Sequence, residues 1–65
     1  MKNKMGKIHK KTKIYYVRWY RNGYNYRDTS ECTWDDVLEC KRQAKELGET
    51  IEYEYDYTKE ETYYV

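Results

Sequence analysis

A single run of β-favouring residues, Lys13–Tyr20 (KIYYVRWY), most limits what this chain can fold into. Apart from Lys13 and Arg18, every residue in the run is β-branched or aromatic, and such side chains suit a pleated sheet. Because the run is apolar on both faces, it is typical of a central strand with a neighbour on each side. We therefore expect the other elements to be arranged around residues 13–20.

The pair Asn22-Gly23, which follows this strand, predicts a tight hairpin. A type I′ turn needs positive φ at both central positions, and Asn-Gly is the pair that best tolerates it. The second strand would then cover residues 24–28. The register expected from such a turn pairs Tyr20 with Asn25, Trp19 with Tyr26, and Arg18 with Arg27.

A helix is predicted over residues 34–47 by its two end signals. Thr33 can cap the backbone N–H of Asp36 in an arrangement related to the capping box. At the other end Gly48 stands where a left-handed residue commonly ends a helix. The apolar positions form one broad stripe, into which Lys41 projects, with its stem expected to pack on the sheet.

The third strand is expected over residues 51–57, where Ile51 and three tyrosines alternate with carboxylates. A right-handed crossover through the helix can place it beside the first strand. The expected fold is therefore α+β with the order β-β-α-β: a three-stranded sheet in the order 2-1-3 with one helix on one face. This order also brings acidic side chains to the face of Arg18 and Arg27, which offsets the repulsion of that like-charged pair.

These elements divide the side chains between a covered and an open face of the sheet. The covered face is expected to hold the core: Tyr15, Val17, Trp19, Tyr26, Trp34, Val37, Leu38, Ala44, Leu47, Ile51, Tyr53 and Tyr55. No second helix is available for the other face, and its Tyr and Arg residues are types enriched at interface hot spots. The candidate binding surface is Ile14, Tyr16, Arg18, Tyr20, Asn25 and Arg27. An ordinary solvated face with scattered tyrosines is the alternative.

The formal net charge of +1 hides an uneven distribution. Residues 1–27 carry nine Lys or Arg and no acid, whereas residues 28–65 carry all twelve acids and four bases. Mutual repulsion of the lysines predicts a flexible basic arm over residues 1–12, ahead of a domain over 13–58. Residues 59–65 are expected to form a tail or a short fourth strand.

Little in the sequence points to catalysis, and we expect neither an enzyme nor a cofactor. The only histidine, His9, lies in the basic arm without a visible partner, and three glycines make no phosphate-binding loop. Glu52, Glu54 and Asp56 could be weighed as a metal site, but basic neighbours favour salt bridges, so no metal is expected. Cys32 and Cys40 are expected to be reduced thiols at or near the core. With no apolar run near 18 residues and no signal peptide, we expect a cytoplasmic protein without a membrane span.

The pattern of YYVRWYRNGYNYRDTS, TWDDVLECKRQAKELGE and IEYEYDY over about residues 13–57 resembles small uncharacterised proteins encoded by bacteriophages of Gram-positive hosts. The resemblance implies a phage-derived inhibitor of a host or immune factor, or a protein that sequesters a nucleotide signal in an oligomer. We therefore expect a non-catalytic interaction protein that acts through the open sheet face, which would bind a target or a second copy of the chain in a homo-oligomer. The alternative is a nucleic-acid-binding module that uses the sheet aromatics and the basic arm.

Overall fold

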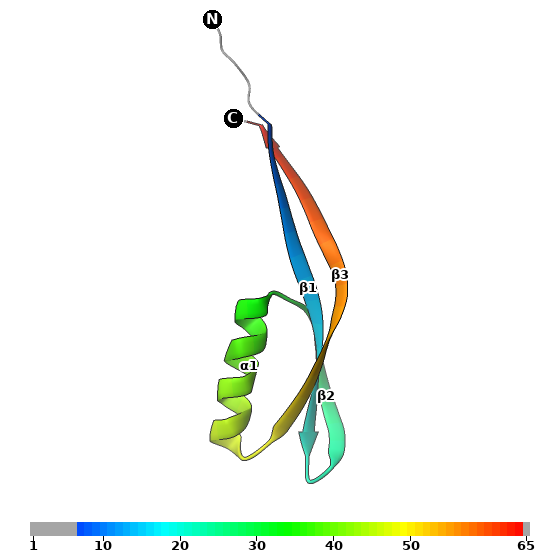
Figure 1. The fold of residues 1–65 in the computed structure, drawn as a ribbon. Coiled ribbons are helices and arrows are strands. Elements are labelled where there is room, and N and C mark those ends of the chain that lie inside the picture. The colour runs from blue at the N-terminus through cyan, green and yellow to red at the C-terminus, as the bar shows by residue number, and fades with distance from the viewer. Residues whose placement is uncertain (1–6, 65) are drawn as a thin grey trace, which may run out of the picture.

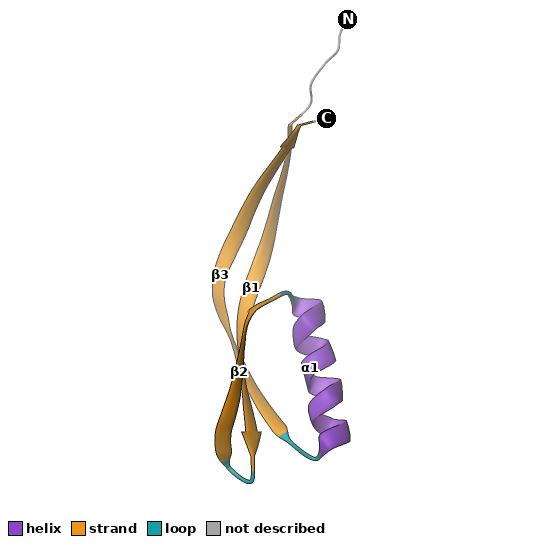
Figure 2. Cartoon of the chain, turned by 180° about the vertical axis from the view of Figure 1, so that it is seen from behind, coloured by secondary structure: helices purple, strands orange, loops and turns teal. Residues whose placement is uncertain are grey.

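The computed structural model describes residues 7–64, which form three strands and one helix (Figure 1). In chain order these are β1 (Lys7–Arg21), β2 (Tyr24–Cys32), α1 (Trp34–Leu47) and β3 (Thr50–Tyr64). The sheet order is β2-β1-β3, and β1 is antiparallel to both neighbours. With α1 on one face of an open sheet (Figure 2), the predicted α+β fold and strand order are confirmed.

The local signals at the turn and the helix ends are confirmed as well. Asn22 and Gly23 both have positive φ, at 51° and 81°, as a type I′ turn requires. Thr33 and Asp36 form a full capping box, in which the Asp36 amide donates to Thr33 Oγ1 and the Thr33 amide donates to the Asp36 carboxylate. Gly48 ends the helix with φ of 72°, in the left-handed region.

Strands β1 and β3 are much longer than expected. The prediction of a flexible arm over residues 1–12 is wrong for residues 7–12, which continue β1 and pair with β3; residues 1–6 lie outside the described part. Residues 59–64 are neither a separate tail nor a fourth strand, because β3 runs on to Tyr64. The repulsion among the lysines was overestimated because Glu61 lies across from Lys10 and Glu60 across from Lys11.

The molecule therefore has two parts. The body, residues 14–57, contains the three-stranded sheet and the helix. The last pair between β1 and β2 joins Tyr15 to Cys32. Beyond it, residues 7–13 and 58–64 continue alone as a two-stranded ribbon (Figure 1). The structure is accordingly elongated, with extents of 62 × 20 × 12 Å.

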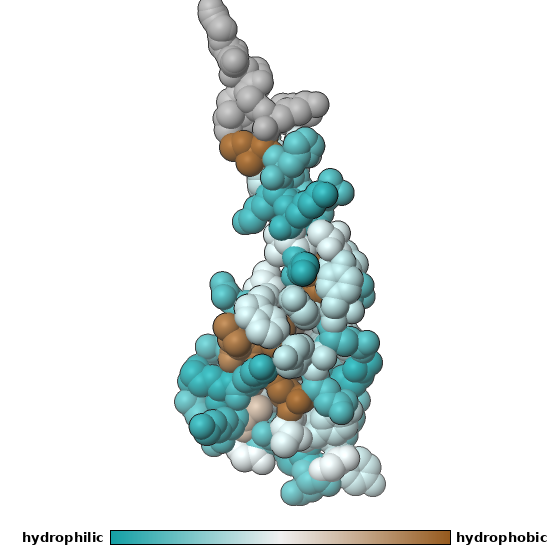
Figure 3. Space-filling view, in the orientation of Figure 1, coloured by the Kyte–Doolittle hydropathy of each residue, from teal (hydrophilic) through white to brown (hydrophobic). Residues whose placement is uncertain are grey.

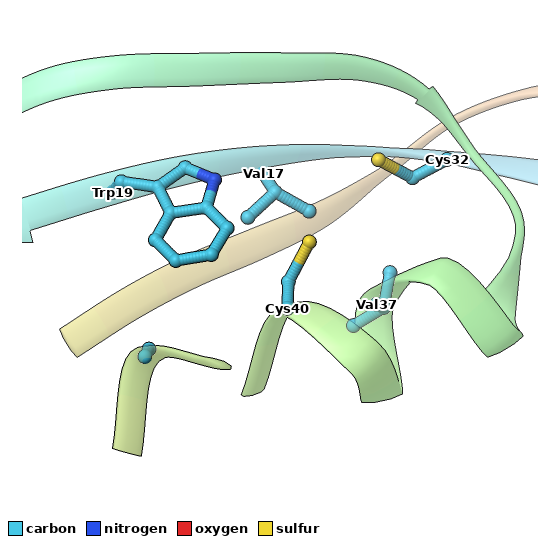
Figure 4. Packing of buried hydrophobic residues seen from close by; sticks show 6 residues of the cluster. Val17, Trp19, Cys32, Val37 and Cys40 are labelled. Carbon is cyan, nitrogen blue, oxygen red and sulfur yellow. The ribbon is translucent and has the colours of Figure 1, made fainter. Parts of the chain in front are cut away.

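The core lies between α1 and the sheet and is smaller than expected. Its buried side chains are Val17, Trp19, Cys32, Val37, Cys40 and Ala44 (Figure 4), and Tyr15 and Ile51 pack against them. Burial raises the pKa of both thiols, which are free, as expected. The expected core members Tyr26, Trp34, Leu38, Leu47, Tyr53 and Tyr55 remain exposed. A helix of 14 residues is about 21 Å long and has one narrow contact stripe, so it covers only the middle of the sheet.

The hairpin register departs from the prediction at a β-bulge. Tyr20 pairs with Asn25 as expected, but Trp19 then pairs with Arg27, which leaves Tyr26 as the extra residue. The pairing of Arg18 with Arg27 is therefore wrong, and Arg18 lies across from Asp28. The Asn25 amide donates to the carbonyls of Trp19 and Arg27 and so satisfies backbone groups at the bulge.

Two further bulges change which face a side chain occupies. On β2 the register shifts between the pairs Val17–Thr29 and Tyr15–Cys32, and Glu31 there has a φ of 58°, which is uncommon for a residue with a Cβ. On β3 the shift falls between Tyr55 and Tyr57. The strict alternation read from the sequence breaks at this point, so Tyr57 lies on the opposite face from Tyr55.

Candidate binding surface on the open sheet face

The structure brings together most, but not all, of the side chains predicted to form the open face. Tyr16, Arg18 and Tyr20 alternate along β1 on the face away from α1, and each is partly exposed. Asn25 joins them through a hydrogen bond of 3.0 Å from its Nδ2 to the Asp28 carboxylate. These four residues form the candidate surface together with three carboxylates: Asp28, Glu52 and Glu54.

Arg27 was wrongly assigned to this face. The bulge places it on the same side as Trp19, and its guanidinium lies 4.0 Å from the centre of the indole ring. A cation over an aromatic face is a favourable arrangement, and here it covers a buried tryptophan from the helix side. Arg27 therefore protects the core and contributes nothing to the open face.

Ile14 does lie on this side of the sheet, but only 4% of it is exposed. Its cross-strand partner Tyr57 donates a hydrogen bond from its hydroxyl to Glu31. Because Tyr57 is on β3 and Glu31 on β2, the tyrosine side chain must cross β1, where Ile14 lies. Ile14 is thus part of a small second apolar contact and is not available to a partner.

The polar atoms of the open face form fixed pairs across all three strands. Tyr16 donates to Asp28 at 2.6 Å, and Tyr20 donates to Glu52 at 2.8 Å. Between the two tyrosines, Arg18 forms an ion pair of 2.5 Å with Glu54. The Arg18 guanidinium also lies 5.1 Å from the centre of the Tyr16 ring. The side chains are therefore oriented before any partner binds.

The hydrogen bonds of this face shift the pKa of Asp28, Tyr16 and Tyr20. The hydrogen bond from Tyr16, and then that from Asn25, lowers the pKa of the Asp28 carboxyl because each stabilises the ionised form. The hydrogen bond to Asp28 raises the pKa of Tyr16, and the one to Glu52 raises that of Tyr20. The face has one cationic side chain, Arg18, beside three carboxylate side chains.

A shallow depression of about 360 Å³ lies at the β3 side of this face. Its lining residues are Tyr16, Arg18, Glu54, Tyr55 and Asp56. Two of them are carboxylates and one is cationic, so the depression has no excess of positive charge. Within residues 7–64 no group of three His, Cys, Asp or Glu side chains is placed to hold a metal ion.

The helix side carries an aromatic cluster that sequence reasoning assigned to the core. Trp34 lies 5.4 Å from Tyr15 and 5.5 Å from Tyr53, measured between ring centres. The ring centre of Tyr55 lies 6.3 Å from that of Tyr15. The exposed fractions of Trp34, Tyr53 and Tyr55 are 41%, 41% and 53%. Lys41 packs on the cluster, with its ammonium 4.7 Å from the centre of the Tyr53 ring. The projection of Lys41 into the apolar stripe was the available signal that this flank of the helix is open.

On the helix side, the Glu49 carboxylate just after the end of α1 is also held by hydrogen bonds. The Arg21 guanidinium donates to Glu49 at 2.9 Å, and the Tyr26 hydroxyl donates to the same carboxylate at 2.5 Å. These donors, Tyr26 first, lower the pKa of Glu49. This contact links the hairpin end of β1 and β2 to the loop between α1 and β3, and it holds the Tyr26 side chain outside the core.

Comparisons with known proteins complete the description of the site. No family model matches this chain, and neither a curated protein nor a solved structure matches it. Among the described residues, no helix has both the length and the apolar character needed to cross a membrane.

Proposed function

We propose that this chain is a small non-catalytic protein that binds a protein partner through its open sheet face. The observation that carries the proposal is the oriented row of Tyr16, Arg18 and Tyr20, which α1 leaves uncovered. Tyr and Arg are the residue types that most often dominate binding energy at protein interfaces. Because hydrogen bonds already fix these side chains, a partner would lose little of its binding energy in ordering them.

The charge of the face indicates what kind of partner fits. Three carboxylates around one arginine favour a basic protein surface, through complementary electrostatics. The resemblance to small phage proteins is consistent with a host factor as that partner. Two copies of the face would repel each other, so we propose that the free protein does not dimerise through it. Light scattering on a gel-filtration column tests this point, and a dimer lost on changing Tyr16 to Ala would contradict it.

The same charges speak against two other ligands for this face. A nucleotide signal is anionic, and the depression places Glu54 and Asp56 beside its single arginine. A nucleic-acid strand would bring its phosphates against Asp28 and Glu52 as well. We therefore do not propose either ligand here, and a thermal-shift assay with cyclic oligonucleotides should show no increase in melting temperature.

An affinity capture from bacterial lysate tests the proposed surface. The bait would be the full chain, the double variant Tyr16→Ala/Tyr20→Ala, and a matched control, Tyr24→Ala/Tyr53→Ala. The control also removes two exposed tyrosines, but from the opposite side of the sheet. We expect the first variant alone to lose a specifically retained partner while its circular dichroism stays unchanged. Equal retention by all three baits would show that the open face is not the binding surface.

A further inference from the structure

The ribbon has a charge opposite to that of the body. Residues 7–13 and 58–64 contain five lysines and two glutamates, a formal charge of +3, whereas residues 14–57 contain ten acids and six bases, a charge of −4. Lys10, Lys11, Lys13 and Lys59 are all exposed. In the space-filling view strongly hydrophilic side chains gather along the ribbon (Figure 3). A polyanion is therefore attracted to the ribbon end of the molecule more strongly than to the body.

The register sorts the ribbon side chains onto two different faces. On one face Ile8 lies across from Tyr63, Lys10 from Glu61 and Thr12 from Lys59, so one pair of the three is apolar. The other face is polar throughout its described side chains: His9 lies across from Thr62, Lys11 from Glu60, and Lys13 from Thr58. Lys11 and Lys13 share this polar face and are about 6.6 Å apart along the strand, at twice the rise per residue.

We propose that the ribbon binds double-stranded DNA by lying in the major groove with its polar face toward the base edges. The major groove of B-form DNA is about 12 Å wide and admits a two-stranded ribbon. Seven residue pairs at about 3.3 Å each give roughly 23 Å of ribbon, about two thirds of one helical turn of 34–36 Å. Lysine and threonine side chains donate to base-edge acceptors, and Lys10 and Lys59, on the other face, can reach the phosphates beside the groove.

The charge pattern argues against a second copy of this chain as the partner that binds the ribbon. Symmetric antiparallel pairing of two β1 edges through residues 7–13 would place lysines near lysines. The same pairing of two β3 edges would bring Glu60 and Glu61 together, and like charges in adjacent strands are destabilising. Lysines on an exposed edge are also a common protection against such pairing. A duplex polyanion satisfies the positive charges without this conflict.

Fluorescence anisotropy with a labelled 21-base-pair DNA duplex, titrated at several salt concentrations, tests the proposal. Each phosphate contact contributes about −0.9 to the slope of log K against log salt concentration. We expect Lys10→Gln/Lys59→Gln, which removes the two lysines that can reach the phosphates, to reduce the steepness of the slope by about 1.8 relative to the unaltered chain. The matched control Lys41→Gln/Lys45→Gln removes the same charge from α1 and should leave the slope unchanged. Absence of binding at low salt, or equal effects of the two variants, would overturn the proposal.

Two further arms separate the groove from general attraction to polyanions. A duplex with bulky substituents at the thymine C5 position, which fill the major groove, should bind weakly, and duplex RNA should do the same because its major groove is deep and narrow. Equal binding of these duplexes or of polyglutamate would contradict groove insertion. Glu60→Gln removes a carboxylate from the polar face and should tighten DNA binding, a gain that misfolding cannot produce. Weaker or unchanged binding by this variant would count against the assigned face.

Discussion

The body and the ribbon are built from the same two strands, yet different forces hold them together. In the body, β1 contributes Val17 and Trp19, which are fully buried beneath α1. In the ribbon, β1 and β3 continue with regular pairing, but the threonines, the glutamates and Lys10, Lys11, Lys13 and Lys59 stay exposed or half-exposed. A two-stranded ribbon without a covering layer is only marginally stable in water. The difference shows that backbone pairing sets the shape of both parts, whereas apolar burial stabilises only the body.

The largest test of this difference compares one side chain from each part. Trp19→Ala removes a fully buried indole and should cost about 3–5 kcal/mol, enough to unfold most molecules of so small a domain. Ile8→Ala in the ribbon, where Ile8 is 50% exposed, should change stability by no more than about 0.5 kcal/mol. Urea unfolding followed by circular dichroism measures both. Similar losses from the two variants would mean that the ribbon is part of one cooperative core.

A smaller loss of stability is expected from a substitution at Gly48, where the chain turns after α1; the ribbon has no such turn. Gly48 has a φ of 72° and open space around the position of a Cβ, so a substitution there is strained by its backbone alone. Gly48→Ala should destabilise the body by about 1–2 kcal/mol. Gly48→Asn should cost clearly less because asparagine tolerates the left-handed conformation. If both variants lost the same stability, φ would not be the cause.

Acid should weaken the body through its hydrogen-bonded carboxyls. The pKa of Asp28 is lowered by Tyr16 and Asn25, that of Glu49 by Tyr26 and Arg21, and that of Glu39 by Arg42. Each lowered pKa contributes stability that is fully present above the unfolded value, about 3.9 for Asp and 4.3 for Glu, and is lost as pH falls through the folded value.

The free energy of unfolding, measured from pH 6 down to pH 2, should therefore fall below about pH 5. Asp28→Asn should be less stable than the unaltered chain at pH 6 and should show a shallower decline. A parallel decline in both proteins would remove Asp28 from the explanation.

The smallest effect is expected from the charge pairs of the ribbon. Glu61 lies across from Lys10 and forms an ion pair of 3.9 Å with Lys59, and exposed pairs of this kind contribute about 0.2–1 kcal/mol. Glu61→Gln should therefore change the unfolding of the body by less than about 0.5 kcal/mol, while amide exchange in residues 8–13 becomes faster. Hydrogen exchange resolved by residue measures both parts at once. Slower exchange in those residues would show that Glu61 does not support the ribbon.

Local signals in the sequence predicted the fold well, and patterns over longer distances predicted the site less well. The Asn22-Gly23 turn, the Thr33 cap and Gly48 each depend on one or a few residues, and all three are confirmed. The assignment of Arg27 to the open face failed because the prediction carried a simple register through the hairpin. A one-residue bulge moves every later side chain of that strand to the opposite face of the sheet, and no turn residue in the sequence marks its position.

The sequence by itself determined the order of the elements, the helix bounds, the hairpin turn and the place of β1 in the middle of the sheet. These features follow from backbone preferences and from the periodicity of apolar residues, which act over a few neighbouring positions. Only the tertiary structure decided which tyrosines are buried, where the three bulges fall and how far β1 and β3 extend. Those outcomes depend on contacts between distant segments, because one short helix covers a limited area and pairing between lysines and glutamates can prolong a ribbon beyond it.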